Sequence, residues 1–421
     1  MGTNPASVTF FFPYRQISGV PVLFLRMARH LADRHGIDTR VIDYPDGYMA
    51  RTLRETGAAV KILPFHDGVP LTIPPDTLLI MQSILPYTIR PELRIDRATR
   101  VAFWTLYHLN LIQTIIPLPW FRHVQTRYRL FHDLFTDTLM ISLKHRLQAL
   151  VRDMNDHRAL FFMDGSTLRF TAERLAVAIR NPVYLPLACE DVPQNPKKPS
   201  RIERQGPLHV CWVGRIADFK TPILVYTIGK LSEVARKKRM SITFHVIGEG
   251  PDEAMIRSLN VEHDCFRLIY AGVKAGRILD DYLLKRIHVL AAMGTSALEG
   301  ARLGLPTILL DASYGPVGDG YRYRWLFESE EYGLGDIIGA THYEKGNDSL
   351  EKRIDALISD GEELSEKTYE YCRKNHFISS VGKRFLALQE AASFRYGDFQ
   401  PQILQKGPVR RSYEFMRQSW Q

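Results

Sequence analysis

The sequence predicts an α/β protein built from two doubly wound domains, each with a parallel sheet covered by helices. Apolar runs of strand length alternate with segments of helical period, which is the pattern of parallel strands joined by crossover helices. The chain has 421 residues, more than one hydrophobic core usually organises. Residues 191–206, which are rich in proline and basic side chains, are typical of a solvated linker between two such domains.

The first half of the chain contains a series of short apolar runs and one amphipathic segment. We expect strands at residues 8–12, 39–42, 60–63, 77–81, 100–104, 139–142, 159–163 and 183–185. Residues 21–35 have helical period, and the positions expected to face the core are Val22, Leu23, Leu25, Met27 and Leu31.

The second half repeats this pattern after the linker. Strands are expected at residues 208–213, 242–247, 267–271, 289–292 and 307–310, and a helical tail at about 364–392. These elements predict an N-terminal domain at 1–190, a linker at 191–206, a C-terminal domain at 207–375 and a terminal segment at 376–421.

Composition favours a protein with anionic partners in a reducing compartment. The formal charge of +9 is compatible with nucleotides, anionic lipid or nucleic acid. The four cysteines lack a paired short spacing, so we expect free thiols and no zinc site. The N-terminus lacks the pattern of a secretion signal, and the uncharged stretch 109–121 is shorter than the ~20 residues that span a bilayer. We therefore expect a cytoplasmic protein, soluble or peripheral to a membrane.

The most informative stretch is `HVLAAMGTSALEGARLGLPTILLD`, residues 288–311, which predicts a strand, a small-residue turn, a short helix and a second strand. A phosphate beside Gly294, Thr295, Ser296 and Ala297 would meet free backbone N–H groups and the positive end of a helix dipole. We expect Glu299 in the first helical turn, where it could accept hydrogen bonds from a pair of ligand hydroxyls.

Two further turns follow strands of the same domain. In `VGRIADFK`, Arg215 and Lys220 could supply two fixed cations to a dianionic group, although charges in such a loop, taken alone, are more often simply solvated. The turn `VIGEGP` contains Gly248 and Gly250. It lacks the third glycine of the dinucleotide fingerprint, where Glu253 stands instead, and this argues against an NAD enzyme.

Together and in this order, the three turns resemble the donor-binding domain of retaining GT-B glycosyltransferases of family 4. The family's pattern is a Gly-Arg with a Lys five residues after the Arg, a glycine-rich turn ending in Gly-Pro, and a helix with a Glu followed by `AxxxGxPxI`. The matching motifs lie within residues 208–311, about a quarter of the chain. The resemblance implies a GT-B fold: two Rossmann-like domains facing a central cleft, with a helix near 369–389 crossing back to the first domain.

The resemblance also implies roles for residues of the second domain. Arg215 and Lys220 would bind the donor diphosphate beside Gly214 and Gly248. Glu299 would bind the ribose hydroxyls, and the amides from Thr295 to Leu298 would cradle phosphate. Family members often carry another Glu eight residues before the ribose-binding one, and here that position is Ala291. The segment Met293–Ser296 resembles a variant loop found in some members.

Two features of the first domain resemble the family more weakly. Gly19, in the turn after the first strand, resembles a loop glycine whose backbone lies near the phosphates. His108 follows the strand at 100–104, where the family often has a histidine that contacts donor sugar or acceptor. A histidine beside apolar residues can equally have a structural role.

The implied activity is transfer of a glycosyl group from a nucleoside diphosphate sugar to an acceptor hydroxyl, with retention of configuration. No Asp-x-Asp sequence is present, so we expect no metal requirement and no cofactor besides the donor substrate. The resemblance implies that region 106–158 contributes to the acceptor side of the fold, and its basic and aromatic side chains then favour a carbohydrate or lipid-linked glycan acceptor at the inner face of an anionic membrane. Such an acceptor would place the protein in the synthesis of lipopolysaccharide, cell-surface polysaccharide or glycolipid. The alternative for this region is a core helix with a solvated basic face.

Three other functions remain open at this stage. The alanine at position 291 is compatible with a non-catalytic homologue that binds nucleotide or a partner. A GT-B epimerase acting on a sugar nucleotide would share the same motifs. A nucleic-acid-binding protein has little support, because the sequence contains no recognition helix, zinc or RNA-binding sheet motif.

Overall fold

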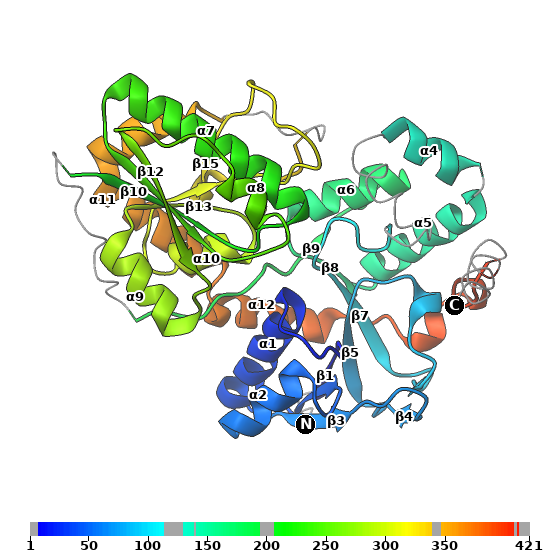
Figure 1. Cartoon of the computed structure of the whole chain (residues 1–421). Coiled ribbons are helices and arrows are strands. Elements are labelled where there is room, and N and C mark those ends of the chain that lie inside the picture. The colour runs from blue at the N-terminus through cyan, green and yellow to red at the C-terminus, as the bar shows by residue number, and fades with distance from the viewer. Residues whose placement is uncertain are drawn as a thin grey trace. The chain divides into compact units, whose positions relative to one another are not determined.

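The computed structural model describes residues 7–112, 129–138, 140–193, 206–338, 347–407 and 411 (Figure 1). The chain forms two compact units. One comprises Met1–Ala188 together with Ile378–Gln421, and the other comprises Cys189–Phe377. The chain therefore passes from the first unit to the second and returns to the first for its C-terminal segment.

The first unit is built on a parallel sheet with strand order β3-β2-β1-β5-β7-β8-β9. Its strands are β1 (Ser7–Phe11), β2 (Thr39–Asp43), β3 (Lys61–Pro64), β5 (Thr77–Gln82), β7 (Arg100–Thr105), β8 (Leu160–Phe162) and β9 (Val183–Tyr184). Two short strands, β4 (Leu71–Thr72) and β6 (Leu93–Arg94), pair separately. The order reverses direction beside β1, as expected of a doubly wound sheet.

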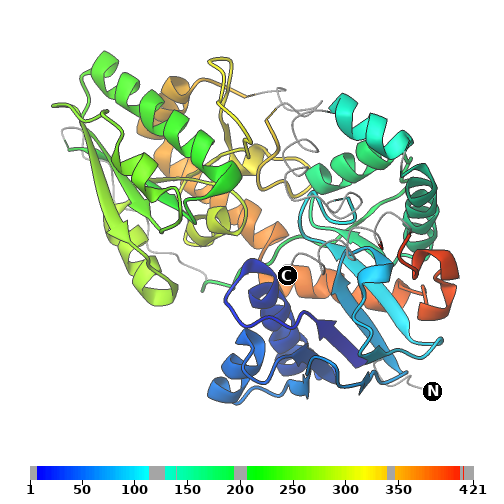
Figure 2. The same cartoon turned by 45° about the vertical axis from the view of Figure 1, so that its right-hand side comes forward.

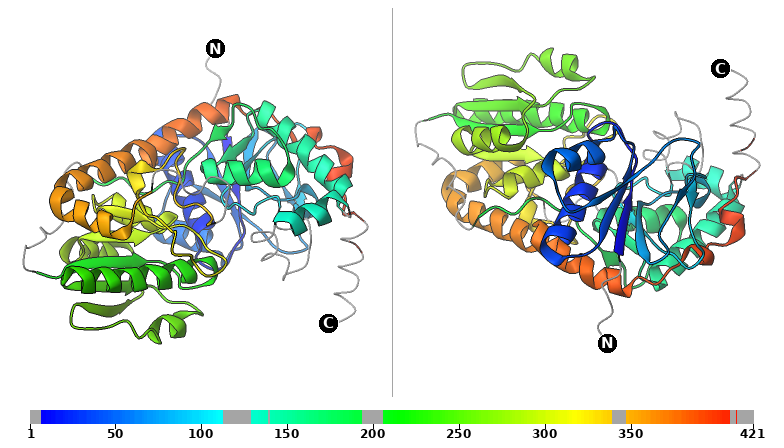
Figure 3. Two further views of the ribbon diagram at one scale, coloured as in Figure 1. Left: turned by 90° about the horizontal axis from the view of Figure 1, so that it is seen from above. Right: turned by 90° about the horizontal axis from the view of Figure 1, so that it is seen from below.

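The helices of this unit are α1 (Gly19–His35), α2 (Tyr48–Thr56), α4 (Arg129–Asp137), α5 (Ile141–Asp156), α6 (Gly165–Leu175) and α12 (Ile378–Ala391), with 3₁₀ turns η1 (Pro86–Thr88), η4 (Tyr396–Asp398) and η5 (Pro401–Ile403). Helix α12 lies beside α1 (Figure 3). The ring of Phe385 in α12 packs 6.0 Å from that of Phe10 in β1. The C-terminal helix is therefore part of the first unit's core.

Helix α1 confirms the predicted amphipathic segment and begins two residues earlier than expected. Leu23, Leu25, Met27 and Leu31 are buried, whereas Val22 is only partly buried. The ring of Phe24, which the prediction omitted, packs against Phe10 in the sheet at 5.2 Å.

The strand expected at 139–142 is wrong. Helix α5 begins at Ile141, and Leu139 lies outside the described residues. The buried positions Leu147, Leu150, Val151 and Met154 continue the helical period, and the short apolar run before them does not by itself distinguish strand from helix. The helical tail expected at 364–392 is two helices, α11 (Leu350–Asn375) and α12, separated at His376–Phe377.

The second unit contains a sheet with strand order β12-β11-β10-β13-β14-β15. Its strands are β10 (Leu208–Val213), β11 (Ile242–Ile247), β12 (Phe266–Gly272), β13 (Val289–Ala292), β14 (Thr307–Leu309) and β15 (Arg324–Trp325). Strand β15, which the sequence did not predict, pairs antiparallel with β14 and the other pairings are parallel.

The helices of this unit are α7 (Thr221–Lys238), α8 (Glu253–Arg257), α9 (Gly276–Arg286), α10 (Thr295–Ala301) and α11, with 3₁₀ turns η2 (Asp218–Lys220) and η3 (Leu326–Glu328). Helices α7 and α11 pack side by side (Figure 2), and ion pairs such as Lys237–Glu351 connect them. The core between helices and sheet includes the buried rings of Trp212, Phe244 and Trp325.

None of the described helices combines the length and apolar character needed to cross a membrane. All four cysteines carry free thiols.

Candidate functional site

The three glycine-containing turns of the second unit lie at one edge of its sheet. They follow strands β10, β11 and β13, which are neighbours and run parallel. The register aligns Val213 with Ile247, and the N–H of Gly214 donates to the carbonyl of Ile247 at 3.0 Å. The carboxyl edge of a parallel sheet is where ligands bind in doubly wound domains, so these turns form the candidate site.

The glycines at this edge allow the turns to approach closely. Gly248 has φ +133°, and a Cβ placed there would lie 2.0 Å from the carbonyl oxygen of Gly214. Gly214 itself has φ +149°, and its Cβ position faces Ser296 Oγ at 3.4 Å. A side chain at Gly248 would therefore separate the first two turns, and Gly214 brings the start of α10 close to the first.

Arg215 and Lys220 extend from the first of these turns. Arg215 is exposed, and no hydrogen bond or ion pair joins it to any side chain that the structure describes, a set that leaves out the side chain of Asp218. Burial lowers the pKa of the Lys220 ammonium, and the nearby positive charge of Arg215 lowers it further. Two cations are thus held near each other without a described carboxylate to neutralise them, which is the electrostatic character of an anion site.

Helix α10 begins close to the first of these turns, where Ser296 Oγ lies 3.4 Å from the Cβ position of Gly214. Its N-cap is Gly294 at φ +60°, and no described side chain caps the helix. The N–H of Gly294 donates to the carbonyl of Leu334 at 2.7 Å. The N–H groups of Thr295 and Ser296 have no acceptor among the described residues, so they can donate to a ligand.

The position of Glu299 differs from the prediction. The helix begins at Thr295, so Glu299 lies in its second turn and not in its first. Its Oε2 accepts a hydrogen bond from Arg302 Nε at 3.0 Å, and Arg302 also pairs with Asp280. Oε1 makes no bond to a described residue, so Arg302 orients the carboxylate and leaves one oxygen for a ligand.

Comparisons with known proteins identify the architecture. No family model matches the chain, and no curated protein sequence shows significant similarity to it. Among solved structures, a glycosyltransferase from Rickettsia africae ESF-5 superposes with a TM-score of 0.52 at 11% identity, over 92% of this chain and 99% of that one. The lipopolysaccharide outer core galactosyltransferase WaaB, in its apo form, gives 0.52 at 12% identity, over 91% and 98%. Anabaena Alr3699/HepE in complex with UDP gives 0.50 at 10% identity, over 91% and 100%.

These structures share one architecture. This chain has the GT-B fold. At such low identity the similarity establishes the fold alone, so the chemistry has to be argued from the residues of this chain.

In this GT-B protein, the position of the family's first glutamate falls inside a strand. Ala291 lies in β13, is buried, and belongs to the core of the second unit. The turn that follows is short and leads directly through Met293 to Gly294. Position 291 therefore lies inside the sheet and carries no carboxylate.

Gly19 and His108 belong to the first unit, after strands β1 and β7. Gly19 is the exposed first residue of α1, and a Cβ there would meet no other atom within 4 Å. His108 is buried and packs edge-on against Phe170 with ring centroids 5.3 Å apart. Burial lowers its pKa to about 3, so its imidazole is neutral at physiological pH.

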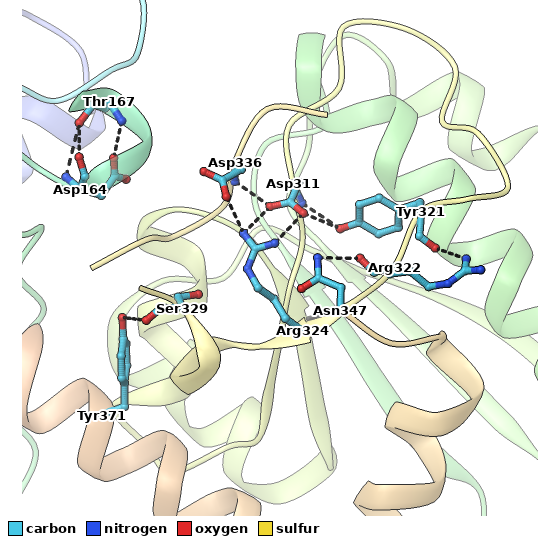
Figure 4. A network of polar contacts seen from close by, with 10 residues as sticks. All are labelled: Asp164, Thr167, Asp311, Tyr321, Arg322, Arg324, Ser329, Asp336, Asn347 and Tyr371. Atoms are coloured by element: carbon cyan, nitrogen blue, oxygen red, sulfur yellow. Dashed lines mark hydrogen bonds and ion pairs between the residues drawn. The ribbon is translucent and has the colours of Figure 1, made fainter. Parts of the chain in front are cut away.

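Sequence reasoning missed a buried polar network beside the site (Figure 4). Asp311, the residue that ends the 288–311 stretch, accepts two hydrogen bonds from Arg324 and one from the N–H of Asp336. Burial raises the pKa of Asp311 to about 6, an effect that the guanidinium of Arg324 opposes. The available signal was an acidic residue directly after a buried strand at the carboxyl edge.

The basic and aromatic region 106–158 is described only in part, since residues 113–128 and 139 lie outside the described ranges. In the described part, Lys144 is buried and pairs with Asp137, and Arg146 donates to the carbonyl of Gln402 at 2.9 Å. These two cations therefore stabilise the first unit. Helix α4 exposes apolar side chains instead: Leu130 is 85% exposed and Leu134 is 59% exposed.

Proposed function

We propose that the protein is a glycosyltransferase that moves a sugar from a nucleoside diphosphate sugar to an acceptor hydroxyl, with retention of configuration and without a metal ion. The observation that carries the proposal is the pair Arg215 and Lys220, held at the carboxyl edge with no described counter-anion. The GT-B fold supports it, since the glycosyltransferases described above share that fold.

The chemistry follows from where negative charge develops. Breaking the bond between the sugar and the diphosphate leaves charge on the departing phosphate oxygens, and preorganised donors that stabilise this charge lower the barrier. Arg215, Lys220 and the first amides of α10 are such donors. A bound diphosphate would also raise the depressed pKa of Lys220, because it supplies the missing opposite charge.

Glu299, the predicted ribose-binding residue, has chemistry compatible with that role. The open carboxylate oxygen of Glu299 can accept hydrogen bonds from the ribose hydroxyls. For His108, in the first unit, contact with the donor sugar or the acceptor stays a prediction. For Gly19, also in the first unit, contact with phosphate stays a prediction.

The first test is nucleotide binding measured by calorimetry with UDP, GDP and ADP in a chelator. We expect one of them to bind, and Lys220→Met or Arg215→Ala to weaken binding at least tenfold. In turnover, loss of one preorganised donor costs about 3 kcal/mol, or roughly a hundredfold. The control is Lys237→Met, which changes an exposed lysine on α7.

Two results would contradict the proposal. One is a wild-type protein that binds none of the three nucleotides. The other is near-normal turnover in Arg215→Ala, which would remove Arg215 from the mechanism.

The burial of Ala291 in β13 favours a second candidate, a GT-B homologue that binds nucleotide or a partner without transferring sugar. This candidate predicts nucleotide affinity without hydrolysis or transfer of any sugar nucleotide. Conversion of a free sugar nucleotide in the absence of acceptor would instead reveal an epimerase. Product analysis by NMR distinguishes the three activities.

For the acceptor, we propose a carbohydrate or lipid-linked glycan used in lipopolysaccharide, cell-surface polysaccharide or glycolipid synthesis at the inner face of the cytoplasmic membrane. The exposed Leu130 and Leu134 of α4 support peripheral contact with lipid. Co-sedimentation with anionic vesicles should fall severalfold in the double variant Leu130→Ser, Leu134→Ser and also at high salt. Val69→Ser, at another exposed apolar residue of the same unit, is the control. Equal sedimentation of all variants would contradict membrane contact through α4.

A further inference from the structure

Asp311 lies two residues beyond the end of β14, in the same unit as the proposed donor site. Its carboxylate is fully buried, and the Arg324 guanidinium binds it through two hydrogen bonds of 3.0 and 2.7 Å. Tyr321 Oη donates to Oδ2 at 3.2 Å. This network connects β14 to β15, the antiparallel strand that carries Arg324.

One side of the network supports the start of α10. The N–H of Asp336 donates to Asp311 Oδ1 at 2.7 Å. Two residues earlier, the carbonyl of Leu334 accepts the N–H of Gly294 at 2.7 Å. Gly335 between them has φ +117°, and a Cβ there would lie 2.6 Å from the carbonyl oxygen of Leu310. The segment therefore fits closely against β14 and holds the N-cap of α10.

The other side of the network supports the turn that carries Lys220. Two residues after Asp311, the N–H of Ser313 donates to the carbonyl of Phe219 at 2.9 Å. The ring of Phe219 packs against Tyr314 with centroids 5.6 Å apart. Phe219 directly precedes Lys220, so the loop after β14 holds this lysine's backbone in place.

We propose that the Asp311–Arg324 ion pair positions the two loops that would bind the donor diphosphate. Arg324 and Asp311 are positioning residues and do not contact the diphosphate. The inference rests on the proposed function. Each of the two backbone contacts, to Gly294 and to Phe219, is made by a residue two positions from a member of the network. Fixing both loops from one buried point sets the separation between the α10 amides and the backbone that carries Lys220.

The positioning role does not require the ion pair to add net stability. A buried ion pair often contributes little net stability, because desolvation of its charges offsets their attraction. Its strict bidentate geometry instead restricts where the attached loops can lie. A lysine cannot reproduce that geometry, because its ammonium is a point charge without a planar fork.

The experiment compares Arg324→Lys with Arg353→Lys. Arg353 is a matched control because it is also a buried arginine of this unit, pairs with Glu328 at 2.8 Å and donates to the carbonyl of Tyr323, the neighbour of Arg324. Dissociation constants are measured by calorimetry for UDP, GDP, ADP and inorganic pyrophosphate, on variants whose thermal unfolding shows that they are folded. Hydrogen exchange of the Gly294 and Ser313 amides is measured in parallel.

We expect Arg324→Lys to bind pyrophosphate and the preferred nucleotide at least tenfold more weakly than wild type, with faster exchange at Gly294 and Ser313. Arg353→Lys should bind within twofold of wild type, even where its melting temperature falls by a similar amount. If Arg324→Lys does not fold, Asp311→Asn takes its place with the same expectations.

The outcomes separate the two proposals. Wild-type affinity in Arg324→Lys, or equal weakening in Arg353→Lys, would overturn the positioning role while the proposed function stands. A wild-type protein that binds no nucleotide and no pyrophosphate would overturn the proposed function, and the positioning role with it.

Discussion

At the scale of single residues, Glu299 and Lys220 differ in what the fold provides for their charges. Glu299 is held by Arg302 at 3.0 Å and is oriented before any ligand binds. Burial lowers the pKa of the Lys220 ammonium, and the like charge of Arg215 lowers it further. The carboxylate is therefore preorganised for neutral hydroxyls, whereas the ammonium gains stabilisation only when an anion arrives.

This difference predicts how Glu299→Gln separates two parts of a nucleotide. The amide keeps the shape of the side chain but loses the charge that orders it against Arg302, so ribose binding should weaken. We expect about tenfold weaker affinity for the preferred nucleoside diphosphate and unchanged affinity for inorganic pyrophosphate, which has no ribose. Calorimetry with both ligands checks this. Equal weakening for both would assign Glu299 to the phosphates or to folding.

At the scale of elements, the sequence predicted the strands and the three turns that make the candidate site. Strands from β10 to β14 were recognisable because each is a short, largely apolar run with a glycine, a proline or a polar residue within two positions of its end. Strand β15 and the Asp311 network could not be recognised in the sequence. Arg324 pairs antiparallel with Leu309 only after a long connection that has neither helical nor strand periodicity. The first turn of α10 was misjudged for Glu299, since a small-residue turn does not show which residue begins the helix.

The turn after β11 provides a test at this scale. Gly248→Ala places a Cβ 2.0 Å from the carbonyl oxygen of Gly214, at a φ that alanine rarely adopts. We expect a loss of roughly 1–3 kcal/mol in unfolding free energy together with weaker nucleotide binding, because the first two turns must separate.

Gly229→Ala is the matched control. Gly229 lies inside α7 with no atom within 4 Å of its Cβ position, so alanine should raise stability by up to about 1 kcal/mol. Chemical denaturation measures both. If Gly248→Ala changes neither the unfolding free energy nor nucleotide binding, the close approach of the turns is not required.

At the scale of the whole molecule, the GT-B fold persists at 10–12% identity to solved structures. The fold can persist at such low identity because it depends on buried strands and glycine turns, and many different sequences can form these. The residues that specify the sugar and the acceptor are not constrained in that way. Sequence and fold therefore predict which residues of the second unit form the candidate donor site in more detail than they predict the identity of the acceptor.

Three histidines outside the candidate site make the stability of the second unit depend on pH. His209 Nδ1 lies 2.8 Å from His245 Nε2, His245 Nδ1 lies 2.7 Å from Tyr282 Oη, and His288 Nδ1 accepts the N–H of His209. Burial, reinforced by neighbouring positive charge, lowers the pKa of His245 to about 4 and that of His288 to about 4. The folded unit therefore holds these rings in their neutral form.

The unfolded chain binds these protons near pH 6.5, so the stability that the neutral histidines provide is complete above that pH and is lost as the pH falls toward 4. At about 1.4 kcal/mol per pKa unit, His245 alone would account for a loss on the order of 2 kcal/mol between pH 7 and pH 5. Urea unfolding at the two pH values should show this loss in wild type and in His66→Asn, which changes an exposed histidine. The loss should be smaller in His245→Asn. An identical pH dependence in all three proteins would show that protonation of the cluster does not oppose folding.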